Sequence, residues 1–125
     1  MKNGLAVGDQ QTLRFIVDEG MVAAFEGKTV HRVLSTFHLV YYAELTARKL
    51  IEPFLEDYED AAGSEIFLRH IAPTKVGDSV VVEARLKGIE GRKIICEISA
   101  SNSSGPISAG TQTQMLIERG ELERL

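Results

Sequence analysis

The fold class is decided by residues 36–51, which read TFHLVYYAELTARKLI and carry the long helical pattern of the chain. At about 100° per residue, seven small or apolar side chains share an arc narrower than about 150°. They are Leu39, Val40, Ala43, Thr46, Ala47, Leu50 and Ile51. Ser35 or Thr36 can cap the first turn, and Pro53 stands where a helix must stop. We therefore expect a helix from about Thr36 to Ile51 with one buried face.

Strand patterns lie on both sides of this helix. Before it, Leu13, Phe15 and Val17 alternate with polar residues, as in a half-buried strand. After it come four further strand-like runs separated by turn residues: 65–72, 79–86, 92–100 and 107–118. This order predicts an α+β domain with a mainly antiparallel sheet of about five strands and one long helix. Unpaired sheet edges favour pairing with a second copy, so we expect a homodimer.

Two segments carry weaker patterns. Residues 18–33 mix Gly20 and Gly27 with a small apolar cluster, and we expect a loop there with one helical turn. Residues 56–62 are acidic and are followed by Gly63, which also predicts a loop.

Composition and charge exclude several classes of protein. The chain has 125 residues, which predicts a single domain over residues 1–125. Lys and Arg number 14 against 18 Asp and Glu, and the net charge of −4 argues against a nucleic-acid partner. No apolar run is long enough to cross a membrane, and the first residues do not resemble a signal peptide. With Cys96 as the one cysteine, the sequence predicts a cytoplasmic protein without an intrachain disulfide.

Common cofactor, metal and nucleophile motifs are missing. The run Gly27-Lys28-Thr29 ends like a phosphate-binding loop, but Val22 stands where the first glycine is needed. There is no Gly-x-Ser-x-Gly motif, and the three histidines lack metal-ligand spacing. We therefore expect no metal and no cofactor.

Three polar residues stand where the patterns predict buried or half-buried positions. His70 occupies an inward strand position, where a hydrogen-bonded core histidine is the alternative to a functional one. Glu44 lies beside the buried helix stripe, where an ion pair with Arg48 is the alternative. Thr36 lies about 80° around the helix from Glu44 and about 12 Å along its axis, and helix capping is its alternative role.

Taken together, these segments resemble the fluoroacetyl-CoA thioesterase-like family of hotdog-fold acyl-CoA thioesterases. The matching stretches are residues 33–39, Glu44, and residues 63–70, 72–77, 90–93 and 110–111. The most specific signal is a threonine at Thr36, a glutamate at Glu44 and a histidine at His70. The similarity extends from residue 12 to residue 118, over nearly the whole chain.

The resemblance implies a hotdog fold in which the sheet wraps around the long helix. It implies three catalytic residues, Thr36, Glu44 and His70, and three substrate-binding residues, Ser35, Gly63 and Gln114. Gln114 stands where the family often has arginine, because residues 110–114 read GTQTQ instead of the family's GTHER. The resemblance also implies a homodimer, or a tetramer of two dimers, with the site between protomers. His70 could then serve the other subunit's Thr36 and Glu44.

The activity implied is hydrolysis of a small acyl-CoA thioester to the free acid and CoA. A partly desolvated Glu44 would act as base or nucleophile, His70 would exchange a proton, and the helix N-terminus at Thr36 would hold the oxyanion. Residues 18–33, expected near the acyl pocket, show no match, so specificity for the fluoroacetyl group is not implied. Two alternatives stay open: a hotdog enoyl-thioester hydratase or dehydratase, and a non-catalytic acyl-thioester-binding dimer.

Overall fold

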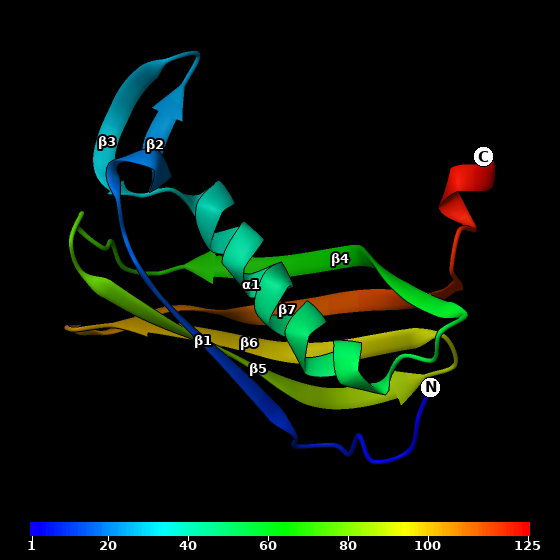
Figure 1. The fold of residues 1–125 in the computed structure, drawn as a ribbon. Helices are drawn as coiled ribbons and strands as arrows, with labels where there is room; N and C mark the ends of the chain where they lie inside the picture. The colour runs from blue at the N-terminus through cyan, green and yellow to red at the C-terminus, as the bar shows by residue number, and fades with distance from the viewer.

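A five-stranded antiparallel sheet with one long helix across its face forms most of the molecule (Figure 1). The computed structural model describes residues 1–125. In spatial order the strands are β1 (Gln10–Ile16), β5 (Ser79–Glu90), β6 (Lys93–Asn102), β7 (Gly105–Glu118) and β4 (Glu59–His70). Each neighbouring pair is antiparallel, so the predicted α+β class and sheet type are confirmed.

Helix α1 (Thr36–Ile51) has the predicted bounds, and its predicted stripe faces the sheet. Six of the seven stripe residues are buried, and they pack with inward residues of the sheet such as Ile94 and Ile98. Ser35 is the cap, because its hydroxyl accepts a hydrogen bond from the His38 N–H at 3.1 Å. The hydroxyl of Thr36 is therefore free for another partner. No helix of the structure is long and apolar enough to cross a membrane.

The loop predicted for residues 18–33 is wrong, because most of this segment is a β-hairpin. One short helical turn, η1 (Glu19–Met21), is present as expected, and β2 (Val22–Phe25) and β3 (Lys28–Leu34) follow it. The turn between them has positive φ angles at Glu26 (51°) and Gly27 (79°), the geometry that two-residue hairpins favour. Two register shifts interrupt the pairing, so the sequence lacks regular alternation. The hairpin projects beyond the sheet at the N-terminal end of α1 (Figure 1).

The acidic loop predicted for residues 56–62 is shorter than expected, because β4 already begins at Glu59. Two cationic partners make acidic residues compatible with a strand here. Glu59 pairs with the amino group of Met1 at 3.0 Å, and Asp60 pairs with Arg48 at 3.0 Å. Two short helical turns complete the chain, η2 (Glu52–Phe54) before β4 and η3 (Leu122–Arg124) after β7.

Strand β4 lies at an edge of the sheet and pairs with β7 alone. This edge strand carries exposed apolar residues, since Ile66 is 38% exposed and Phe67 is 60% exposed. A register shift between Gly63 and Glu65 bends the strand near its middle. This edge offers unpaired backbone groups and apolar side chains on one strand.

Candidate active site

The hydroxyl oxygen of Thr36 lies 2.9 Å from Nδ1 of His70. Thr36 is the first residue of α1 and His70 is the last residue of β4, so the pair joins a helix start to a strand end. His70 pairs in register with Ser108 of β7, on the helix-facing side of the sheet. The predicted inward orientation of His70 is thus confirmed, and its hydrogen-bond partner is Thr36.

The imidazole of His70 is half-buried, and its Nε2 atom has no hydrogen-bond partner. Burial lowers the pKa of His70 below its ordinary value of 6.5, and the nearby Ala72 backbone partly opposes this effect. At neutral pH the ring is therefore uncharged and can accept a proton. The first N–H groups of α1, at Thr36 and Phe37, have no acceptor within the helix and lie beside this pair.

Glu44 lies two helical turns beyond Thr36 and contacts a different part of the sheet. Its Oε1 accepts a hydrogen bond from Nε2 of Gln112 on β7 at 3.3 Å. The alternative ion pair between Glu44 and Arg48 is wrong, because Arg48 pairs with Glu52 and Asp60 instead. Glu44 is exposed in the protomer, whereas the sequence predicted a partly desolvated carboxylate.

Gly63 on β4 provides the space that the Glu44 carboxylate occupies. A Cβ atom at Gly63 would collide with Oε1 of Glu44 and lie 2.9 Å from its Cδ atom. The same Cβ would lie 3.4 Å from Nε2 of Gln112. A residue without a side chain is therefore needed for Glu44 to approach the strand backbone.

The remaining predicted residues, Ser35 and Gln114, are buried in the protomer, each 1% exposed. The hydroxyl of Ser35 is shared between the N–H and Nδ1 of His38, at 3.1 and 2.6 Å. Gln114 pairs in register with Gly63, and its Nε2 atom is buried without a partner. Their predicted contact with substrate stays a prediction.

The predicted site residues thus form two groups within one protomer. Thr36 and His70 make the first group, and Glu44 with Gly63 makes the second. Eight helical residues correspond to a rise of about 12 Å, which separates the Thr36 end of α1 from Glu44. His70 contacts Thr36 of its own chain. The expectation that His70 serves the Thr36 and Glu44 of another subunit stays a prediction.

Gln112 lies beside Glu44 and was not among the predicted site residues. Gln112 is 0% exposed on the helix-facing side of β7, where a sheet packed against a helix normally carries apolar residues. Two buried glutamines in alternation, Gln112 and Gln114, were the available signal. Their neighbour across the sheet, Cys96, is not a candidate nucleophile, because burial raises the pKa of its thiol to about 11.

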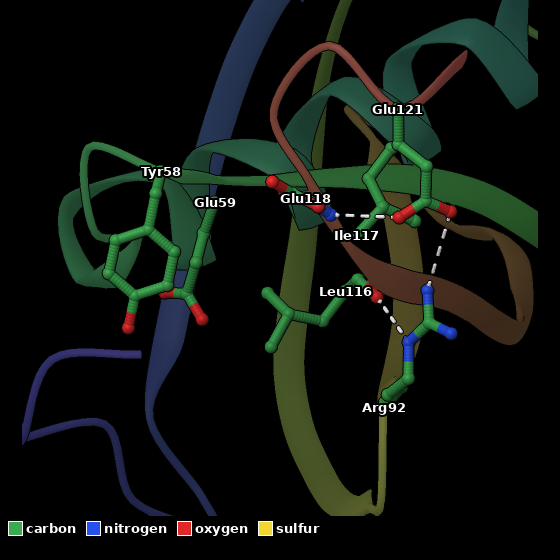
Figure 2. A pocket seen from close by; sticks show the side chains of 7 residues that line it. All are labelled: Tyr58, Glu59, Arg92, Leu116, Ile117, Glu118 and Glu121. Carbon is green, nitrogen blue, oxygen red and sulfur yellow. Dashed lines mark hydrogen bonds and ion pairs between the residues drawn. The ribbon is translucent and has the colours of Figure 1, made fainter. Parts of the chain in front are cut away.

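A shallow pocket of about 410 Å³ lies at the other end of β4, by Glu59 (Figure 2). Arg92 lies on one side of it, donating a hydrogen bond to the Leu116 carbonyl at 2.8 Å and pairing with Glu121 at 3.7 Å. None of the residues that line this pocket belongs to either group of the candidate site. No three His, Cys, Asp or Glu side chains anywhere in the chain gather into a metal site.

Comparison with solved structures defines the class of protein. A hypothetical protein from Thermus thermophilus, a thioesterase superfamily member, is 31% identical, with 98% of this chain and 90% of that chain covered and a TM-score of 0.93. A variant of a fluoroacetyl-CoA-specific thioesterase, in complex with fluoroacetate and CoA, is 27% identical over 94% of this chain and 99% of that chain, with a TM-score of 0.88. The chain is therefore a thioesterase of the hotdog fold, as the sequence predicted.

The family can be stated more narrowly. The fluoroacetyl-CoA thioesterase of Streptantibioticus cattleyicolor is 29% identical over 123 residues, covering 94% of this chain and 88% of that protein. The model of the family described as fluoroacetyl-CoA-specific thioesterase matches residues 17–120, and the chain belongs to this family.

Proposed function

We propose that the protein hydrolyses small acyl-CoA thioesters to the free acid and CoA, with Thr36, His70 and Glu44 as its catalytic residues. The observation that carries this proposal is the 2.9 Å contact between the Thr36 hydroxyl and Nδ1 of an uncharged His70. A hydroxyl paired with a neutral imidazole is a common arrangement for acyl transfer and hydrolysis. Because the chain belongs to a thioesterase family, we assign a thioester as the acyl donor.

His70 acts as the proton acceptor. In one route, Nδ1 takes a proton from Thr36 Oγ1 as Oγ1 attacks the thioester carbon. In the other route, Thr36 Oγ1 holds a water molecule, and Nδ1 takes a proton from this water as the water oxygen attacks. The carbon–sulfur bond then breaks, and the CoA thiolate takes the proton back from the imidazolium. Direct attack by Thr36 adds a second step, in which water hydrolyses the acyl-threonine ester.

The N-terminus of α1 stabilises the negative charge that develops on the thioester oxygen. The N–H groups of Thr36 and Phe37 have no acceptor within the helix, and the helix dipole favours an anion at this end. Ser35 already caps the His38 N–H, so the two earlier donors are left for the oxyanion.

A second copy of the chain brings Glu44 to the Thr36–His70 pair. An antiparallel pairing of β4 with β4 of a second copy, centred on Phe67, sets His70 of one copy opposite Ser64 of the other and next to Gly63. The exposed residues Ile66 and Phe67 lie at that centre and would be covered by the pairing. Because the Glu44 carboxylate rests on Gly63, it would reach the same thioester.

Three further residues shape the substrate side of this site. Gly63 lies against the substrate together with Glu44, while Ser35 and Gln114 support the site from buried positions. The homodimer is the functional unit, and two dimers can assemble into a tetramer. Each chain acts as a single domain, residues 1–125, in the cytoplasm.

The small size of the acyl group is proposed from the hairpin beside Thr36. Phe25 of β2 and Phe37 of α1 meet edge to face, with ring centroids 5.6 Å apart. Both rings are partly exposed next to the first turn of α1, at 60% and 46%. They form an apolar wall beside the reacting carbon, which leaves little length for a long acyl chain.

A thiol-release screen tests the proposed function. Short, long, aromatic and halogenated acyl-CoA thioesters are offered to the purified protein, and free CoA is measured with a thiol reagent. Release of CoA from short acyl groups, with His70→Gln inactive, supports the proposal. Loss of enoyl absorbance without thiol release would identify a hydratase or dehydratase, and binding without turnover would identify a non-catalytic binding protein.

A further inference from the structure

Two adjoining hollows connect His70 with a lysine at the end of the sheet. The smaller, of about 240 Å³, is lined by Val33, His70, Ile71, Ala72 and Pro73. The larger, of about 660 Å³, includes Lys75 among its lining residues. They share Val33, Ala72 and Pro73, so they adjoin, and the two hollows together are called here the Lys75 groove. Four residues lie between His70 and Lys75, and that length of chain spans at most about 18 Å.

The walls of the Lys75 groove are held together by specific hydrogen bonds. Nδ2 of Asn102 donates to the Pro73 carbonyl at 3.1 Å and lies 2.9 Å from the Thr74 hydroxyl. Oδ1 of the same amide accepts from the Ser104 N–H at 2.9 Å, so the β6–β7 turn is tied to the segment that follows β4. Val33 of β3 forms an isolated bridge with Lys75. The groove is therefore a preformed feature of the protomer.

Charge distinguishes the far end of this groove. Lys75 is exposed and takes part in no ion pair, although the chain as a whole has a net charge of −4. The one carboxylate that lines the groove is Asp78, which accepts hydrogen bonds from the Ser103 hydroxyl at 2.7 Å and the Ser79 N–H at 2.8 Å. These donors hold the Asp78 carboxylate in the turn, and Lys75 is the one cation that lines the groove.

We propose that the Lys75 groove binds the pantetheine arm of CoA and that the Lys75 ammonium binds its phosphates. The inference rests on the proposed function, because it starts from a thioester held at His70. The chemistry of the arm fits the groove from end to end. Apolar walls at Val33, Pro73 and Val76 suit its methyl and methylene groups, and the cation stands where the anionic end would emerge. An acidic protein would thereby attract a polyanion through one local charge.

Kinetics with full-length and truncated thioesters test this proposal. The substrates are the acyl-CoA with the highest kcat/KM in the screen and the N-acetylcysteamine thioester of the same acid, which lacks the phosphates. We expect Lys75→Gln to raise KM for the acyl-CoA about three- to tenfold, with kcat little changed, and Lys75→Glu to raise it further. Neither variant should change KM for the truncated thioester.

Lys87→Gln is the matched control, because Lys87 is an exposed lysine without an ion pair near the opposite end of β5. The proposal is overturned when Lys75→Gln behaves like this control, or when it raises KM equally for both thioesters. If the wild-type protein hydrolyses neither thioester, the proposed function fails. Calorimetric titration with CoA then tests separately whether the Lys75 groove binds CoA. Binding of CoA that weakens in Lys75→Gln and not in Lys87→Gln supports the groove, and equal binding overturns it.

Discussion

Thr36 and His70 lie 34 residues apart in the sequence, and their side chains meet at 2.9 Å within one protomer. The contact depends on Ser35, whose hydroxyl caps the helix and leaves the Thr36 hydroxyl free. It also depends on β4 running its full length to His70, beside the start of α1. The two side chains are therefore carried directly by a helix and a strand, and neither residue stands on a loop.

Substitutions at Thr36 test whether its hydroxyl takes part in the reaction. Thr36→Ala should lower kcat about 100-fold or more, whereas Thr36→Ser should retain most of it, because the serine hydroxyl can reach His70. Neither change should alter the free energy of unfolding by more than about 0.5 kcal/mol, since Thr36 is exposed and is not the cap. Thiol-release kinetics and urea unfolding provide the two readouts. Equal rates for the serine and alanine variants would leave Thr36 without a chemical role.

The lowered pKa of His70 predicts how activity and stability change with pH. Log kcat/KM should fall as the pH drops below the pKa of His70, which lies under 6.5, because protonation removes the acceptor nitrogen. Between the folded-state pKa and 6.5, the unfolded chain binds more protons than the folded chain. The stability contributed by neutral His70 is therefore present above about pH 6.5 and is lost as the pH falls through the folded-state value. Urea unfolding across this range should show that pH dependence in the wild type and lack it in His70→Gln.

The close approach of Gly63 to Glu44 predicts a specific effect of adding one methyl group. Gly63→Ala should displace the Glu44 carboxylate and lower kcat by about as much as Glu44→Gln does. Stability should change by less than about 1 kcal/mol, because the exposed end of Glu44 can rotate away. In a double-mutant cycle, the second substitution should cost little further activity. Full additivity of the two losses in activity would show that Gly63 acts independently of Glu44.

Gln112 is expected to be a positioning residue for Glu44. Gln112→Leu removes the 3.3 Å hydrogen bond with Glu44. It should lower kcat by up to about 10-fold, with little change in KM. In the Glu44→Gln background the same change should have almost no further effect on kcat. Thr111→Val is the control, because the neighbouring side chain on β7 points to the opposite face of the sheet. A rise in KM with unchanged kcat would mean that Gln112 contacts the substrate instead of positioning Glu44.

Much of this fold could be predicted from local patterns. The helix bounds at Thr36 and Ile51 follow from a buried stripe, a capping residue before it and a proline after it. Strands β5 to β7 follow from alternating residues and glycine-containing turns. The β2–β3 hairpin could not be predicted in the same way, because two register shifts within four residues of β2 remove the alternation that identifies a strand.

The candidate site was predictable as a set of residues but not as an arrangement. His70 and Glu44 were identified as polar side chains at positions expected to be buried or beside a buried face. Which groups they contact depends on pairing across the sheet, and a local pattern does not contain that information. The Gln112–Glu44 bond links residues 68 positions apart, and the register of β4 with β7 creates it together with the space at Gly63.

Mixed dimers provide the most direct measurement of a thioesterase site that combines Thr36 and His70 of one copy with Glu44 of another. His70→Gln and Glu44→Gln, each inactive alone, are unfolded together in equal amounts and refolded as mixed dimers. Random pairing makes about half of the dimers mixed, with one of two sites intact in each, so thiol release should recover to about a quarter of the wild-type rate. Thr36→Ala mixed with His70→Gln should recover nothing, because those residues act within one chain. Failure of the His70→Gln and Glu44→Gln mixture to recover thiol release would contradict a site shared between copies.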